Sequence, residues 1–193
     1  SKEVLFNLPQ VLVDARGPKN VVLVPEPAYP IYERGALFAG AQVIKVPLLA
    51  ESHFLPDLKS VDPLIWARVA LFWVNYPNNP TAATAPLEFY EAALELAREH
   101  DFVLASDEAY GEIYFEDPPA SALQAGSRQN LAVVNTLSKR SSMTGYRSGS
   151  IVADAELIKA LRVFRPMVGV APPEFTQMAA AWAWSDEDHV CLM

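Results

Sequence analysis

The chain has 193 residues, of which 51% are hydrophobic and 20% are charged, an ordinary balance for a globular protein large enough to bury a core. Its formal net charge of −8 argues against nucleic acid or an anionic membrane surface as the main partner. An anionic ligand must therefore be held by a local site, because the protein as a whole does not attract negative charge.

The first part of the chain alternates between helical patterns and short apolar runs. We expect helices over 3–14, 31–39 and near 62–67, and strands over 21–24, 42–46 and 69–74. Pro9 should kink the first helix or mark its boundary, and Pro25 should stop the first strand. The proline–asparagine turn at 76–80 ends the third strand.

The second part continues the alternation. We expect helices over 86–100, 155–165 and 174–184, and strands over 102–105, 131–134 and 151–153. The strands are near-continuous apolar runs, which is typical of strands that are covered on both faces. The pattern predicts one α/β domain, with a mostly parallel sheet between two layers of helices.

Polar segments follow four of the predicted strands. They are Pro25–Pro30, Asn75–Thr81, Ser106–Tyr110 and Thr136–Lys139. In open α/β sheets a ligand binds outside the carboxyl ends of the strands, where these segments would meet. Taken singly, each has an ordinary explanation: a tight turn at 78–80, a helix cap at Asp107, and half-buried core positions for Tyr29 and Tyr110. Their joint occurrence predicts a binding crevice.

Lys139 is the centre of the most informative segment. It is preceded by the hydroxyls of Thr136 and Ser138 and followed eight residues later by Arg147. A lysine amine can form a Schiff base with an aldehyde, and hydroxyls and a forked guanidinium suit a phosphate. The stretch predicts an attachment site for pyridoxal phosphate (PLP). An exposed basic turn after a strand is the alternative for this stretch taken alone.

The ordered set of motifs resembles the class I/II aminotransferases of the aspartate aminotransferase fold, which are fold type I PLP enzymes. The resemblance runs along essentially the whole chain. It rests on Ser1-Lys-Glu, Pro25-x-Pro-x-Tyr-Pro30, Asn75-x-Pro-Asn-Asn-Pro-Thr81, Asp107-Glu-Ala-Tyr110, Ser138-Lys139 and Gly145-Tyr-Arg147. No single motif is specific, but the set in this order is.

The resemblance implies a role for each polar residue. Lys139 would hold the cofactor as a Schiff base and then act as the base and acid of a proton shift, and Asp107 would pair with the pyridine nitrogen. The other implied contacts are Tyr110 and Asn79 with the phenolate oxygen, Tyr29 with the ring face, Thr136, Ser138 and Arg147 with the phosphate, and the backbone of Ser1 and Lys2, at a helix N-terminus, also with the phosphate. Lys139, Asp107 and Tyr110 are thus the implied catalytic residues.

Three features depart from the family pattern. Ala82 stands where the family usually has glycine, so a turn that needs a positive φ would be strained, and we expect its backbone to differ. Thr136 replaces the usual serine and keeps the hydroxyl. The family's N-terminal segment and C-terminal small domain are absent, so we interpret residues 1–193 as a partial large, PLP-binding domain. The arginine that binds the substrate carboxylate would belong to the absent domain.

Residues 137–149, 169–171 and 177–182 resemble the N-succinyldiaminopimelate aminotransferase branch, which belongs to lysine biosynthesis. The resemblance implies small-molecule amino acid and 2-oxo acid substrates, with 2-oxoglutarate as an acceptor, and a homodimeric full-length protein. An isolated large domain should then expose apolar surface. Three alternatives stay open: a PLP-dependent β-lyase, the aminotransferase-like part of a transcription regulator, and an inactive fragment. The acidic net charge counts against a DNA-binding region.

Cysteine and histidine content limits the remaining chemistry. Cys191 is the single cysteine, so no disulfide can form within one chain, and we expect a cytoplasmic location. The histidines at 53, 100 and 189 do not have the spacing of a metal site. No apolar run approaches the roughly 18 residues of a membrane span, and no secretory signal pattern is visible. We expect no metal, no nucleic acid and no membrane as partner.

Overall fold

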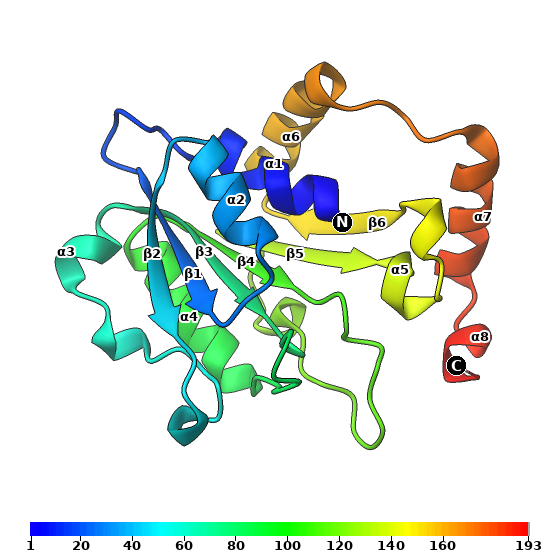
Figure 1. The fold of residues 1–193 in the computed structure, drawn as a ribbon, viewed down its shortest axis with the longest axis horizontal. Helices are drawn as coiled ribbons and strands as arrows, with labels where there is room; N and C mark the ends of the chain where they lie inside the picture. The colour runs from blue at the N-terminus through cyan, green and yellow to red at the C-terminus, as the bar shows by residue number, and fades with distance from the viewer. Residues whose placement is uncertain (193) are drawn as a thin grey trace.

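A computed structural model describes residues 1–192, and its centre is one six-stranded sheet (Figure 1). The strands are β1 (Val21–Glu26), β2 (Gln42–Pro47), β3 (Val69–Asn75), β4 (Val103–Asp107), β5 (Leu131–Thr136) and β6 (Gly149–Ala153). Their order in the sheet is β2-β1-β3-β4-β5-β6, and every neighbouring pair is parallel except β5 and β6. The expected mostly parallel α/β sheet is confirmed.

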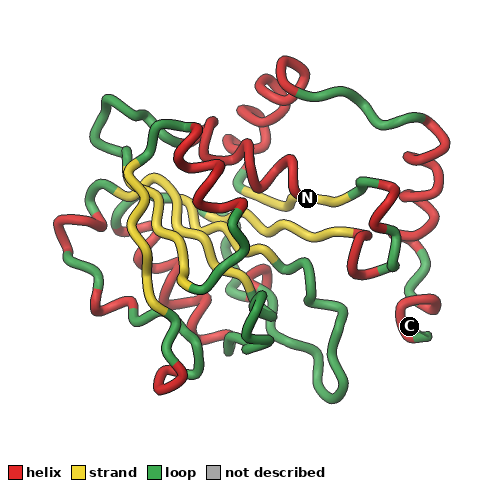
Figure 2. The backbone as a smooth tube through the Cα atoms, in the orientation of Figure 1, coloured by secondary structure: helices red, strands yellow, loops and turns green. Residues whose placement is uncertain are grey.

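Helices lie on both faces of this sheet, as the buried strand sequences predict (Figure 2). They are α1 (Lys2–Leu12), α2 (Ile31–Phe38), α3 (Pro63–Trp66), α4 (Leu87–Glu99), α5 (Leu137–Arg140), α6 (Ala155–Val168), α7 (Glu174–Ser185) and α8 (Asp188–Cys191). Single turns of 3-10 helix occur at 50–52, 58–60, 122–124 and 144–146. Residues of α1, α2 and α6 join the core on one face, and residues of α4 join the core on the other.

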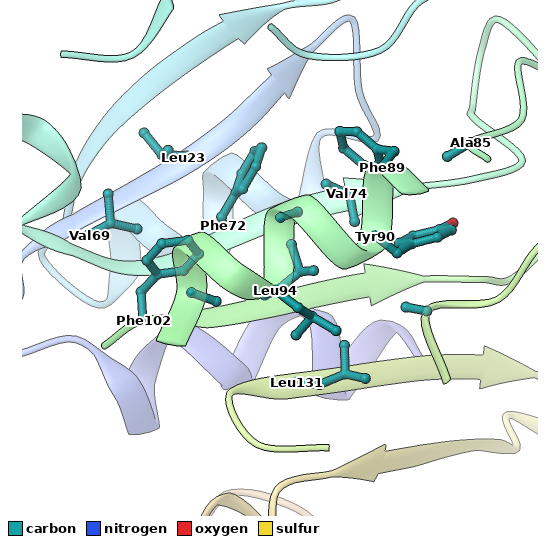
Figure 3. Packing of buried hydrophobic residues seen from close by; sticks show 14 of the residues in the cluster. Leu23, Val69, Phe72, Val74, Ala85, Phe89, Tyr90, Leu94, Phe102 and Leu131 are labelled. Atoms are coloured by element: carbon teal, nitrogen blue, oxygen red, sulfur yellow. The ribbon is translucent and has the colours of Figure 1, made fainter. Parts of the chain in front are cut away.

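Strand β3 shows how the two cores are divided. All seven of its residues are buried. Because successive side chains of a strand point to opposite faces, Phe72 and Val74 pack under α4, whereas Leu71 and Trp73 pack under α1 and α2. Figure 3 shows the α4 side, where Phe89, Tyr90 and Leu94 of the helix lie over the strands.

Gly35 explains how closely α2 approaches α1. A Cβ atom at this position would lie 2.7 Å from the main-chain oxygen of Phe6, a distance that real Cβ atoms essentially never show. Glycine therefore permits a close crossing of the two helices. Tyr32, one turn earlier on α2, is fully buried as a result and stacks on Trp73 with ring centroids 4.9 Å apart.

Several strand ends differ from the expected boundaries. Strand β1 continues through Pro25 to Glu26, because after Leu23 it pairs with β2 alone. Strands β4 and β5 each run two residues further than expected, to Asp107 and Thr136. Polar residues continue these ladders, since Asn75 of β3 pairs with Asp107 and Asp107 in turn pairs with β5. A strand end predicted from the apolar run is therefore too early where polar residues continue the strand pairing.

Pro9 lies inside α1, so the helix does not end there, and the short helices α5 and α8 were not expected. Large apolar side chains are exposed on the C-terminal helices, including Met167 on α6 and Trp182 on α7, with 82% and 75% of their surface accessible. This matches the exposed apolar surface expected of an isolated large domain. Within residues 1–192, no helix combines the length and the apolar character needed to cross a membrane.

Candidate active site

One cleft of about 400 Å³ opens at the carboxyl ends of β1, β3, β4 and β5. It is lined by all ten residues singled out in the sequence, namely Ser1, Lys2, Tyr29, Asn79, Asp107, Tyr110, Thr136, Ser138, Lys139 and Arg147. Five further residues line it that the sequence did not single out: Leu5, Tyr32, Asn75, Ala109 and Thr144. The four polar segments therefore meet as the rule for parallel sheets predicts.

A larger hollow of about 680 Å³ adjoins this cleft and shares Asn79 and Tyr110 with it. Its other walls come from the prolines of the 77–80 turn and from the segment 113–119, and it contains no lysine or arginine among the described residues. We place the site in the smaller cleft, because it brings a buried acid, an amine and a guanidinium together and the larger hollow does not.

Asp107 forms the buried floor of the cleft, with 3% of its surface exposed. The Tyr32 hydroxyl donates to its Oδ2 at 2.7 Å, and the Ala109 N–H donates to its Oδ1 at 3.2 Å. Burial raises the pKa of the Asp107 carboxyl, and these two hydrogen bonds oppose that rise without cancelling it. Each carboxylate oxygen has two lone pairs, so acceptor capacity remains for a ligand.

Tyr32 remains a hydrogen-bond donor over the whole physiological pH range. Its burial, followed by the nearby Asp107 carboxylate, raises the pKa of the phenol well above its ordinary value. Sequence reasoning missed Tyr32, because it lies inside an amphipathic helix and looks like a core residue. Its position one turn before Gly35, the glycine at which α2 crosses α1, was the one hint in the sequence. Only the packing places it beside Asp107.

Asn75 joins two walls of the cleft and is 1% exposed. Its Nδ2 donates to the main-chain oxygen of Asp107 at 2.8 Å, and its Oδ1 accepts from the Asn79 N–H at 2.9 Å. One amide side chain thus fixes the position of the end of β4 relative to the turn after β3. Its position directly after an apolar run was the signal that could have identified it.

The turn 78–82 adopts a left-handed conformation at Ala82, where φ is +60°. The expectation that the backbone would differ at this position is wrong, because Ala82 adopts a positive φ despite its Cβ atom. The Ala82 N–H donates to the Asn78 oxygen at 2.8 Å, and the Thr81 hydroxyl donates to the Asn78 side chain, also at 2.8 Å. These bonds hold the turn in a conformation that is strained for alanine.

Lys139 is placed by the way in which α5 begins. The Thr136 hydroxyl accepts from the Ser138 N–H at 3.1 Å as the N-cap, and it also donates to the Ser148 oxygen at 3.2 Å. In this arrangement Thr136 caps the helix, and its hydroxyl is within hydrogen-bond distance of Ser148 as well. Lys139 lies two residues into α5, with its Nζ 5.4 Å from the centre of the Tyr110 ring.

Arg147 and the N-terminus of α1 also line the cleft. Arg147 is exposed, has a left-handed backbone with φ of +54°, and donates from Nη1 to the Thr144 oxygen at 2.6 Å. Gly149 lets the start of α1 approach β6, since a Cβ atom there would lie 2.6 Å from the Ser1 nitrogen. The first N–H groups of α1 consequently lie at the cleft, where a helix N-terminus favours an anion.

This donor set fits pyridoxal phosphate. An acid, an amine, a guanidinium, a serine hydroxyl and a helix N-terminus all line this cleft. They match the groups of the cofactor, which has a basic ring nitrogen at one end and a phosphate at the other. Tyr29, which packs edge-on against Tyr32 with ring centroids 6.0 Å apart, supplies an aromatic wall.

Several known proteins resemble this chain in sequence and in fold. The chain is 42% identical over 163 residues to the LL-diaminopimelate aminotransferase of Aquifex aeolicus (strain VF5), covering 83% of this chain and 41% of that protein. A solved aminotransferase from Neisseria meningitidis Z2491 has 37% identity and a TM-score of 0.93, covering 98% of this chain and 50% of that one.

A solved structure described as a probable N-succinyldiaminopimelate aminotransferase, from Thermus thermophilus, has 30% identity and a TM-score of 0.88, covering 98% of this chain and 51% of that one. The chain therefore spans about half the length of the relatives that it matches. The family model for aminotransferase class I and II matches residues 1–192. The chain belongs to the class I and II aminotransferases, a family of pyridoxal phosphate-dependent enzymes.

Proposed function

We propose that this chain is the cofactor-binding part of an enzyme that moves an amino group between an amino acid and a 2-oxo acid. The observation that carries the proposal is the cleft itself, which brings together the buried Asp107, Lys139 and Arg147. When bound, pyridoxal phosphate supplies an aldehyde and a ring that accepts electrons from the substrate carbon.

The residues of the floor would control the charge of the ring. Tyr32 and Ala109 hold the Asp107 carboxylate in one orientation, and the carboxylate can accept a hydrogen bond from a protonated ring nitrogen. An opposite charge within about 4–6 Å keeps that proton in place by one to three pKa units. Asn79 and Tyr110 would orient the ring, and Tyr29 would exclude water from one face.

Lys139 would attach the cofactor and transfer protons, and its neighbours at the rim of the cleft would bind the phosphate. The Lys139 amine would attach the cofactor and then, once free, move a proton between substrate and cofactor carbons at its Nζ. Ser138, Arg147 and the first N–H groups of α1 would hold the phosphate. In our proposal Thr136 contributes mainly as the N-cap of α5.

We further propose a diaminopimelate as substrate, either free or N-succinylated, with 2-oxoglutarate as the acceptor. The names of the relatives support this class, since the Aquifex enzyme is called an LL-diaminopimelate aminotransferase and the Thermus structure an N-succinyldiaminopimelate one. The whole protein would be a homodimer in the cytoplasm. The exposed apolar side chains of α6 and α7 support a covering partner, and the single cysteine suits a reducing compartment.

The cofactor site is tested by titrating the protein with pyridoxal phosphate, following its absorbance, and then reducing with borohydride and mapping the modified peptide. We expect one pyridoxyl group on Lys139, lost in Lys139→Ala and retained in Lys159→Ala, which removes an exposed lysine that does not line the cleft. Equal labelling of several surface lysines would contradict a specific site.

The reaction is tested on the loaded protein with LL-diaminopimelate, N-succinyl-LL-diaminopimelate and aspartate in separate reactions. The expected result is release of the matching 2-oxo acid from one of the first two, detected by mass spectrometry. Pyruvate and ammonia from cystathionine, with no 2-oxo acid from the diaminopimelates, would instead indicate a β-lyase. Labelling of Lys139 without any turnover would support the alternative of a chain that binds the cofactor but is inactive by itself.

A further inference from the structure

The residue after Lys139 is an arginine that is almost completely buried. Arg140 has 2% of its surface exposed. Its Nη1 donates to the Ala183 oxygen at 2.8 Å, and its Nη2 contacts the Glu187 Oε1 at 2.5 Å. Its Cζ lies over the Trp184 ring, 5.3 Å from the ring centre. A lone buried cation is unfavourable, so these contacts are needed to keep Arg140 where it is.

Ser141, the next residue, also contacts the C-terminal helices. Ser141 is 8% exposed, and its Oγ lies 2.9 Å from Nε2 of His189. The other ring nitrogen of His189 lies 3.3 Å from Asp186. Two consecutive residues after Lys139 therefore contact one stretch of the C-terminal helices, residues 183–189, which we call the brace.

Arg140 also reaches the segment that carries Tyr110. Its Nε lies 3.8 Å from the Oε1 of Glu112, two residues after Tyr110. Tyr110 is the aromatic ring beneath the Lys139 amine. One guanidinium thus connects the backbones on both sides of the Lys139–Tyr110 contact to the brace.

We propose that Arg140 and Ser141 are positioning residues that hold Lys139 at the cleft by tying α5 to the brace. The inference rests on the proposed function of Lys139 and extends it to residues 183–189, which lie outside the cleft. Neighbouring residues on a helix point about 100° apart, so Arg140 faces the protein while Lys139 faces the cleft. Arg140 does not line the cleft and acts through the backbone of α5.

The length of α5 is the reason why a brace is needed. The helix has four residues, and a helix this short does not hold its shape without outside contacts. Thr136 fixes its first turn, but its last residues depend on Arg140 and Ser141. An apolar residue in place of Arg140 could give similar stability. The planar guanidinium differs because its directional N–H donors fix the position of α5 relative to the brace.

Three substitutions separate positioning from simple stability. Arg140→Met keeps an apolar stem and removes the fork, Arg140→Lys keeps the charge without the fork, and Ser141→Ala removes only one hydroxyl. Lys159→Ala is the matched control, because it breaks an exposed pair with Glu156 on α6. All are compared with the unmodified chain at a temperature where each is fully folded by circular dichroism.

Two measurements are made on each protein. The first is the initial rate at which saturating pyridoxal phosphate labels Lys139, trapped with borohydride and quantified by peptide mapping. The second is hydrogen–deuterium exchange of the peptide over 137–143, with β3 as the internal reference. Arg140→Met should slow labelling about tenfold and speed exchange at 137–143 by a similar factor, because a charged buried hydrogen bond is lost. Arg140→Lys should recover part of both, and Ser141→Ala should change each about threefold.

Wild-type labelling and exchange at 137–143 in Arg140→Met, with only a lower melting temperature, would overturn the proposal and leave a structural ion pair. Faster exchange throughout β3 and α5 together would also overturn it, because the effect would be global. Failure of the unmodified chain to label at Lys139 would count against the proposed function. In that case the exchange measurement still decides whether Arg140 and Ser141 hold α5.

Discussion

The buried floor and the exposed rim of the cleft are built in different ways. At the floor, Asp107, Asn75 and Tyr32 are buried, lie on or against the central strands, and are joined by hydrogen bonds of 2.7–2.8 Å. At the rim, Lys139 and Arg147 are exposed and stand on short helical turns between β5 and β6. The floor is a continuation of the sheet, whereas the rim is an addition to it.

This difference teaches where stability and binding are coupled. Burial raises the pKa of the Asp107 carboxyl, because a buried charge is unfavourable. Holding the charged carboxylate in the floor therefore lowers the stability of the fold. The exposed rim groups contribute little to folding and can be changed with small effects on it. We therefore expect floor substitutions to alter both stability and binding, and rim substitutions to alter binding alone.

Asp107→Asn should have the largest effect. It should weaken pyridoxal phosphate binding about a hundredfold, since the charge that pairs with the ring nitrogen is lost. The unfolding free energy at pH 7 should not fall, because a neutral amide replaces a penalised buried charge. The amide oxygen can accept from the Ala109 N–H, and the amide NH2 can donate to the Tyr32 hydroxyl oxygen in place of the present bond. Cofactor titration and urea unfolding measure the two quantities. Normal affinity with a stability loss above about 1 kcal/mol would reverse the argument.

The pH dependence of the same pair gives an independent check. Burial places the folded pKa of Asp107 above its ordinary value, so the contribution of this group to stability is fully present at low pH. It is lost as pH rises from the ordinary carboxyl pKa through the raised one. In Asp107→Asn this loss should disappear, and the curves of unfolding free energy against pH should separate as pH rises.

Arg147→Ala should have the next largest effect and change binding only. We expect affinity for pyridoxal phosphate to fall about thirtyfold, because the guanidinium that we propose as a phosphate ligand is removed. The unfolding free energy should stay within about 0.5 kcal/mol, since the side chain is exposed and donates a hydrogen bond to the nearby Thr144. Arg147→Lys should recover part of the affinity. Unfolding of the variant under native conditions would show that the rim is structural.

Tyr32→Phe should have a smaller effect, directed at stability. It removes the hydroxyl that donates to Asp107 and should cost about 1.5 kcal/mol at neutral pH. Because this bond lowers the pKa of Asp107, its loss should raise that pKa further. The cost should therefore shrink as pH falls and Asp107 becomes protonated. A cost that is the same at pH 4 and pH 8 would show that Tyr32 acts through packing alone.

Ala82→Gly should have the smallest effect and the opposite sign. Glycine relieves the left-handed strain at φ +60° but loses chain entropy on folding, which leaves about 0.5 kcal/mol of stabilisation. Ala50→Gly is the matched control, because Ala50 is exposed at the start of a single 3-10 turn and is not among the positive-φ residues. It should be neutral or slightly destabilising. Equal effects of the two changes in urea unfolding would mean that the turn carries no strain.

The residues of the cleft differ in how far the sequence could reveal them. Lys139, Asp107 and Arg147 stand in short polar stretches between apolar runs, and such contrasts are visible without a structure. Tyr32 occurs within a predicted helix, where a tyrosine has an ordinary explanation. Arg140, which lies outside the cleft, follows Lys139 in a polar stretch where an arginine also has an ordinary explanation. Their importance comes from contacts with residues 75 and 47 positions away in the chain.

The sequence by itself determined the alternation of strands and helices, the edge of the sheet where polar residues gather, and the family. These are local properties, because the period of apolar residues and the end of each run depend on a few neighbours. Only the tertiary structure decided that Asn75 holds two walls together, that Ala82 adopts a left-handed turn, and that Arg140 joins α5 to residues 183–189. Such contacts join segments that are far apart in the sequence, and the distance between those segments is set only by tertiary packing.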